Sequence, residues 1–296
     1  MALSDNTKGA LLMMGSMAAF TFNDALMKSL AGDVPLVQAI FLRGLVASAL
    51  MVSLAAWQGA LRLKLSRQDG GLLALRTAME IAAVFLFLSA LFNMPIANAT
   101  AILQALPLTV TLAAAVLFGE AIGWRRAVAI GVGFFGVLLI VRPGTEGFTI
   151  YSLYALGAVV VVTARDLAVR RMSGALPSVT VATYAALGVT VAAGIVSFTQ
   201  PWVTLTLPQV LTLAAAALCL MMAYFLSVAV MRMGEIAVVS PFRYTAIVFA
   251  LILGVAAFGE RPDAITLSGA ALVVATGLYT LWRERVVAAS RASDAV

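Results

Sequence analysis

The sequence predicts an all-α membrane protein with ten transmembrane helices, and three observations support this fold class. Of the 296 residues, 63% are hydrophobic and only 11% are charged, against about 25% charged residues in an ordinary soluble domain. The mean hydropathy is +1.06. Ten apolar stretches are long enough to cross a bilayer core, which takes about 20 helical residues. This composition excludes a soluble enzyme, a disordered tail protein and a secreted disulfide scaffold.

The expected helices follow one another with short connections, many of which carry helix breakers. The first stretch runs on to Ala31, well past the small residues of a signal-peptide cleavage site, so it is expected to remain as a helix. Breakers close the first, third, fifth and sixth stretches at residues 32–35, 93–95, 142–144 and 174–177, and the ninth at residues 259–262. The ten expected spans are residues 7–31, 35–57, 71–92, 96–118, 125–141, 150–172, 178–198, 209–232, 236–258 and 265–282.

Basic residues predict that both termini are cytoplasmic. With the N-terminus inside, the outer loops hold only Arg142 and Arg261. The inner loops and ends hold twelve basic residues: Lys8, Arg62, Lys64, Arg67, Arg125, Arg126, Arg170, Arg171, Arg232, Arg283, Arg285 and Arg291. Cytoplasmic loops of membrane proteins are enriched in Lys and Arg. The same rule explains the net charge of +6 without a nucleic-acid partner.

Several kinds of chemistry are excluded or left without candidates. The chain has no histidine and one cysteine, Cys219. It therefore lacks the commonest metal ligand, the imidazole of a hydrolytic triad and any intrachain disulfide. No phosphate-binding Walker sequence is present. The sequence thus predicts no metal, no cofactor and no ATP hydrolysis, so transport would be secondary, driven by a gradient of substrate or ion.

The two halves of the chain, residues 1–145 and 146–296, resemble each other. The first block comprises Thr21, Asp24, Lys28, Gly32 and Pro35, which recur 142 positions later as Thr163, Asp166, Arg170, Gly174 and Pro177. A second block, Ile96-Ala97 with Phe118-Gly119-Glu120, recurs 140 positions later. Each half holds five spans, an odd number, so the second half is expected to enter the membrane inverted. Inverted repeats are typical of transporters that alternate between inward-open and outward-open states; some channels also contain them.

These features resemble the drug/metabolite transporter superfamily in its EamA-type branch, and within it the YddG-type amino-acid exporters. The resemblance rests on Phe41-x-Arg43, on Pro107 in the fourth span, on the two Phe-Gly-Glu sequences, and on the glycines of the fifth and tenth spans. Those glycines are Gly131, Gly133, Gly136, Gly269 and Gly277. The resemblance implies a bacterial inner-membrane exporter with a substrate cavity between the halves and the fifth and tenth spans outside it. Its members carry amino acids, nucleotide sugars, drugs and other metabolites.

Ionisable side chains inside a span are costly and mark candidate sites. Three pairs stand four residues apart, on one helix face, and predict local ion pairs or gates: Asp24 with Lys28, Arg76 with Glu80, and Asp166 with Arg170. Arg165, beside Asp166, belongs with this group. Asp24, Glu80 and Asp166 are the only acidic residues in the expected spans, so they are the candidates for a carboxylate proton carrier.

Arg43 and Arg243 have no acidic residue three or four positions away, so each must pair across helices or face water. A free guanidinium suits a carboxylate, which it binds with two parallel hydrogen bonds. Pro241 precedes Arg243 and can expose a backbone carbonyl. The other candidate substrate-binding residues are Tyr244, Gln104, Asn98, Thr100, Tyr224 and Tyr184. The alternative for these polar residues is interhelical hydrogen bonding.

The sequence therefore predicts a monomeric, multi-pass exporter of small metabolites in the bacterial inner membrane, with the lipid bilayer as its surroundings. Amino acids with aromatic or large apolar side chains are the expected substrates. The two unpaired arginines favour a substrate with a negative group. An exporter of drugs or nucleotide sugars is the alternative within the same class. A channel or a membrane-embedded enzyme is the alternative from a different class.

Overall fold

The computed structural model describes residues 5–60, 65–119, 123–144, 148–170, 172, 176–230 and 239–293, and the regular elements there are all helical. Ten of these helical segments are long and apolar enough to span a membrane, as predicted. In chain order the helices are α1 (Asp5–Lys28), α2 (Leu36–Trp57), α3 (Arg67–Asn93), α4 (Ile96–Leu103), α5 (Leu106–Phe118), α6 (Trp124–Val141), α7 (Ile150–Arg170), α8 (Ser178–Ser197), α9 (Leu207–Val230), η1 (Ser240–Tyr244), α11 (Thr245–Phe258) and α12 (Ala264–Ser293).

Two spans are not the continuous α-helices that the hydropathy pattern predicts. The fourth is divided into α4 and α5 at Gln104 and Ala105, and Pro107 lies in the first turn of α5. A proline has no amide hydrogen, and its ring clashes with the carbonyl four residues earlier, here that of Leu103, the last residue of α4. The ninth span begins with the 3-10 helix η1, which contains Pro241, before α11 continues it. Each irregularity thus coincides with a proline.

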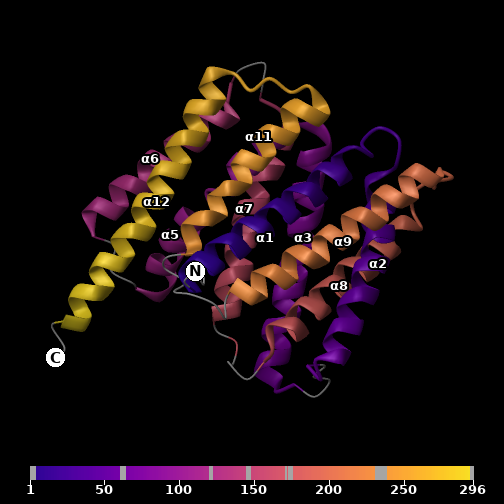
Figure 1. Ribbon diagram of the computed structural model, residues 1–296, viewed down its shortest axis with the longest axis horizontal. Helices are drawn as coiled ribbons and strands as arrows, with labels where there is room; N and C mark the ends of the chain where they lie inside the picture. The colour runs from indigo at the N-terminus through magenta and orange to yellow at the C-terminus, as the bar shows by residue number, and fades with distance from the viewer. Residues whose placement is uncertain are drawn as a thin grey trace.

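The helices pack in four main pairs that join the first half of the chain to the second. α1 lies along α9, α3 along α7, α2 along α8, and α6 along α12. The α6–α12 pair occupies one end of the bundle and the α2–α8 pair the opposite end (Figure 1). Ala99, Ala216 and Ala250 are fully buried in the hydrophobic core and let neighbouring helices approach closely.

The α6–α12 contact depends on two glycines. A Cβ atom added at Gly136 would lie 2.8 Å from the carbonyl oxygen of Gly269, and one at Gly269 would lie 2.6 Å from the carbonyl of Gly136. Because the obstacle in each case is backbone, no side-chain rotation relieves it. This crossing is therefore specific for glycine.

Gly136→Ala is expected to destabilise the protein by about 1–3 kcal/mol, since overpacking forces the two backbones apart. Gly131→Ala is the matched control on the same helix, because a Cβ there meets no atom within 4 Å. Thermal denaturation in detergent measures both. Equal melting temperatures for the two variants would show that α6 and α12 do not depend on this close approach.

The pair is also joined at its end by an ion pair outside the spans. Arg142, which follows α6, bonds to Asp263, the residue before α12, and donates to the Thr266 hydroxyl at 3.1 Å. Asp263 also accepts the backbone N–H of Thr266 at 2.9 Å. The Arg142 hydrogen bond, followed by those of Thr266, holds the pKa of the Asp263 carboxyl well below its usual value.

Candidate substrate site

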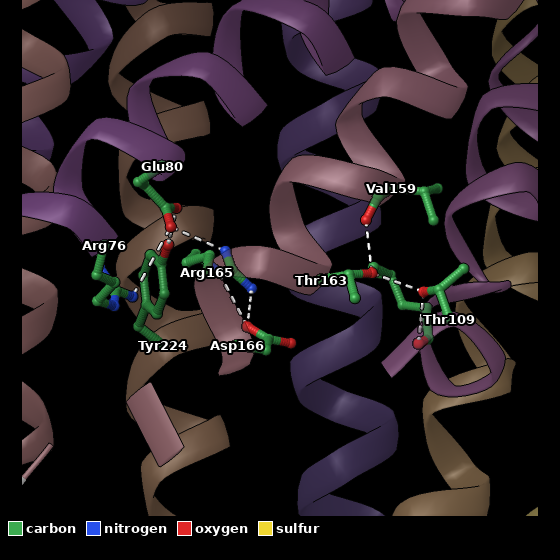
Figure 2. A network of polar contacts seen from close by, with 9 residues as sticks. Arg76, Glu80, Thr109, Val159, Thr163, Arg165, Asp166 and Tyr224 are labelled. Atoms are coloured by element: carbon green, nitrogen blue, oxygen red, sulfur yellow. Dashed lines mark hydrogen bonds and ion pairs between the residues drawn. The ribbon is translucent and has the colours of Figure 1, made fainter. Parts of the chain in front are cut away.

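Glu80, near the centre of α3, is the hub of a charged network between α3, α7 and α9 (Figure 2). Its side chain is buried, and its Oε2 accepts a hydrogen bond from Nη1 of Arg165 at 2.8 Å. The Tyr224 hydroxyl donates to Oε1 at 3.5 Å. Nη2 of Arg76 lies 3.7 Å from Oε2. The pairing of Arg76 with Glu80 that the four-residue spacing predicts is present, but as a loose ion pair rather than a hydrogen bond.

Arg165 holds two carboxylates at once. Its Nε and Nη2 atoms donate to Oδ1 of its neighbour Asp166 at 3.0 and 2.9 Å, while Nη1 reaches Glu80. The sequence also predicts a pairing of Asp166 with Arg170, but the Arg170 side chain lies outside the described part of the chain. In the same part of the bundle, the hydroxyls of Thr109 and Thr163 lie 2.6 Å apart and connect α5 to α7 (Figure 2).

Arg43 forms a second polar group between α1 and α2. Only 6% of this arginine is exposed, and its Nη1 donates to Oδ1 of Asn23 at 3.0 Å. The Asn23 amide in turn donates to Oδ1 of Asp24 at 2.9 Å. The cross-helix partner expected for Arg43 is therefore an amide placed between the guanidinium and a carboxylate.

Arg76 and Arg43 keep hydrogen-bond donors without partners among the described residues. The Nε and Nη1 atoms of Arg76 and the Nε of Arg43 are buried and unbonded there. Most buried polar atoms in folded proteins are hydrogen-bonded, and an unsatisfied buried donor costs free energy. The unused donors are thus cationic and lie inside the bundle, which suits a negatively charged ligand group.

The candidates on the fourth and ninth spans come together where those spans are irregular. Nε2 of Gln104 donates to the backbone carbonyl of Arg243 at 3.2 Å, and η1 contacts α1, α11 and α12. The Arg243 side chain is nevertheless exposed. Tyr244 is buried and packs against α12 where Gly277 leaves room for its ring and hydroxyl. Among these residues, Arg243 has an exposed side chain, and Tyr244 lies in the helix contact.

The remaining candidates lie on α4, α8 and α9. Thr100 is buried on α4, and its hydroxyl has no hydrogen-bond partner among the described residues. Asn98 is half-buried on the same short helix, and Tyr184 is half-buried on α8. Tyr224, by contrast, joins the Glu80 network.

Lys28 does not pair with Asp24 as the spacing suggests. Its Nζ lies 3.4 Å from Oε1 of Glu260 and donates to the carbonyls of Leu91 and Met94 at 3.1 and 2.6 Å. Both carboxylate oxygens of Glu260 also accept the backbone N–H of Ile96 at the start of α4, at 3.0 and 3.1 Å. Lys28 ends α1, so its long side chain reaches the unsatisfied carbonyls at the end of α3 and the nearby carboxylate instead of turning back along its own helix.

Glu260 is the functional candidate that sequence reasoning missed, because it lies beyond the ninth expected span. The signal was its place in the repeated Phe-Gly-Glu sequence. Gly119 and Gly259, the glycines of the two copies, both adopt left-handed conformations, with φ of 69° and 63°, and each ends a helix. Glu120, the glutamate of the first copy, lies outside the described residues.

Ten membrane-spanning helices with charged side chains buried between them define a multi-pass membrane transporter. The chain belongs to the EamA-like transporter family, which matches residues 7–142 and 149–282. Members of the family resembling this chain are transporters of small molecules. The expected family is thereby confirmed.

Relatives with named substrates are similar along most of the chain. The S-adenosylmethionine uptake transporter of Rickettsia bellii is 25% identical over 91% of this chain and 92% of its own. The pseudopaline exporter of Pseudomonas aeruginosa is 27% identical over 89% and 93%, and the riboflavin transporter of Vibrio cholerae is 26% identical over 76% of each chain. A solved crystal structure of another protein shares the fold, with a TM-score of 0.67 over 95% of this chain, 99% of that chain and 20% identity.

Proposed function

We propose that this transporter is a secondary exporter of small metabolites that carry a carboxylate, with aromatic or large apolar amino acids as its substrates. It acts as a monomer in the bacterial inner membrane, with both termini cytoplasmic. The relatives support a small-molecule substrate, and one of them carries S-adenosylmethionine, itself an amino-acid derivative. The cationic donors without partners inside the bundle favour a negatively charged group.

We also propose that the halves are inverted repeats and exchange conformations in alternating access. The four main helix pairs support this. Each half contributes five spans, and each span has a counterpart in the other half. Replacing every helix by its counterpart turns the α1–α9 pair into the α7–α3 pair. The same exchange leaves the α2–α8 and α6–α12 pairs unchanged. The family match to residues 7–142 and again to 149–282 fits two copies of one unit.

The site assignment rests on the exposure of the Arg243 side chain. It is exposed although η1 is contacted by three other helical elements, and a charged side chain facing lipid would be costly. We infer that its guanidinium faces water, beside Gln104, which holds its backbone carbonyl, and that Arg243 meets the substrate carboxylate there.

Counterflow in liposomes with L-phenylalanine and its carboxyl amide tests this assignment. Arg243→Lys keeps the charge but loses the two-pronged geometry, so phenylalanine transport should fall about tenfold or more while yield and melting temperature stay unchanged. Arg243→Ala should reduce it at least as much. The amide should be a poor substrate of the wild type and should be nearly indifferent to both changes.

These two substrates and two proteins form a double-mutant cycle. Arg243 would have a structural role if the coupling free energy between the carboxylate and Arg243 were near zero. A decrease in melting temperature large enough to account for the loss of transport would lead to the same conclusion. Including nucleotide sugars, organic cations and S-adenosylmethionine in the counterflow panel decides between substrate classes. Ohmic current or product formation by the purified protein would indicate a channel or an enzyme instead.

A further inference from the structure

Arg76 is an unusual arginine for the interior of a membrane protein. It lies on α3, one helical turn before Glu80, and its side chain is only 11% exposed. Its one contact with a charged group in the described part of the chain is the 3.7 Å approach to Glu80, and Nε and Nη1 are buried without partners. Glu80 takes its hydrogen bonds from Arg165 at 2.8 Å and from Tyr224 at 3.5 Å, and Arg165 is shared with Asp166. Arg76 therefore contributes charge to this network, while its own requirement for hydrogen bonds is unmet.

An aromatic surface lies beside this arginine. The Tyr224 hydroxyl donates to Oε1 of Glu80 at 3.5 Å, and Nη2 of Arg76 lies 3.7 Å from the other oxygen of the same carboxylate (Figure 2). Its ring packs edge-to-face on Phe20 of α1, with centroids 5.4 Å apart and an interplanar angle of 82°. Edge-to-face aromatic pairs accept a further ring in the same manner. A guanidinium with unbonded donors and an aromatic pair thus lie next to the Glu80 carboxylate, between α1, α3 and α9.

We propose that Arg76 binds the carboxylate of the transported amino acid in the interior of the bundle, with the substrate's aromatic or large apolar side chain against Phe20 and Tyr224. This inference rests on the proposed function and adds a second, buried contact beyond Arg243. The carboxylate supplies the acceptors that Arg76 lacks, and a planar guanidinium binds it with two parallel hydrogen bonds. Arg43, buried with its Nε unbonded, adds positive charge on the side of α2.

Equilibrium binding to the purified full-length protein in detergent tests the proposal. L-phenylalanine and L-phenylalaninamide are compared by calorimetry on wild type, Arg76→Lys and Arg76→Ala. Wild type should bind phenylalanine about tenfold or more tightly than the amide, the discrimination that a charge-assisted hydrogen bond supplies. Both variants should bind the two ligands about equally. Arg76→Lys retains the charge beside Glu80, so it keeps the test valid if Arg76→Ala does not fold.

Matched controls separate this role from general effects. Arg67→Ala removes an exposed arginine from the same helix and should leave the preference for the free carboxylate intact. Phe20→Ala should abolish the preference for phenylalanine over L-alanine, whereas Phe22→Ala, at an exposed position of α1, should not. Tyr224→Phe keeps the ring and should retain that preference.

Three results would overturn the proposal. The first is a preference for the free carboxylate that survives in both Arg76→Lys and Arg76→Ala. If that preference disappears in Arg243→Ala instead, the proposed function stands without this subsite. The second is equal binding of phenylalanine and chloride or inorganic phosphate at Arg76, which would make it a general anion site. The third is a wild type that binds no amino acid at all, a result that rejects the proposed substrate class itself.

Discussion

Glu80→Gln is expected to lower the free energy of unfolding by about 3–5 kcal/mol, the usual cost of removing one partner of a buried ion pair. Glutamine has nearly the same size and shape, so the loss is electrostatic. The acceptor 2.8 Å from Arg165 would become a neutral amide oxygen, and Arg76 would lose its one charged neighbour among the described residues. Two guanidinium groups would then remain in the interior with only Asp166 to neutralise them. Thermal denaturation in detergent and the yield of monodisperse protein measure the effect.

Asp33→Asn is the matched control, because it removes a carboxylate from an exposed turn and should change stability by less than about 0.5 kcal/mol. Glu80→Gln combined with Arg76→Gln should be more stable than Glu80→Gln alone, because Arg76 is the cation left without a carboxylate, whereas Arg165 keeps Asp166. A fully additive double variant, or a Glu80→Gln protein as stable as the wild type, would show that the charge of Glu80 contributes no net stability to this network.

Reversing the charge of Lys28 is expected to have a comparably large effect. In Lys28→Glu, two carboxylates would face each other where Nζ now lies 3.4 Å from Glu260. The carbonyls of Leu91 and Met94 would lose their donor as well. Both side chains of the native pair are only 12% exposed, so solvent screens the repulsion weakly. We expect a loss of about 3–5 kcal/mol and loss of transport, measured by denaturation in detergent and by counterflow.

The exchanged pair, Lys28→Glu with Glu260→Lys, should recover part of this loss but not all of it. The charges are again opposite, yet a lysine at position 260 cannot accept the Ile96 N–H that Glu260 now caps. Lys8→Glu is the control, because its partner Asp5 and Lys8 itself are exposed and such pairs contribute at most about 1 kcal/mol. An exchanged pair no more stable than Lys28→Glu would show that the attraction between Lys28 and Glu260 does not hold these helix ends together.

The sequence by itself determined the number and approximate bounds of the spans. Hydrophobicity over about 20 residues is a local property, and so are the helix breakers that separate one stretch from the next. The i,i+4 geometry of a single helix is equally local, which is why Arg76 does lie beside Glu80. The same reasoning identified most of the charged candidates, since an ionisable residue in an apolar stretch stands out in the sequence alone.

Only the tertiary structure decided which of these groups meet. Lys28 had a partner at the right spacing in Asp24, yet it bonds across the bundle to Glu260, 232 positions away. Glu80 takes its shortest hydrogen bond from Arg165, on another helix. Helical periodicity specifies which face a side chain occupies, but the residues opposite that face depend on which helices become neighbours. That choice comes from close contacts such as Gly136 against Gly269, where two backbones meet because neither residue carries a Cβ atom.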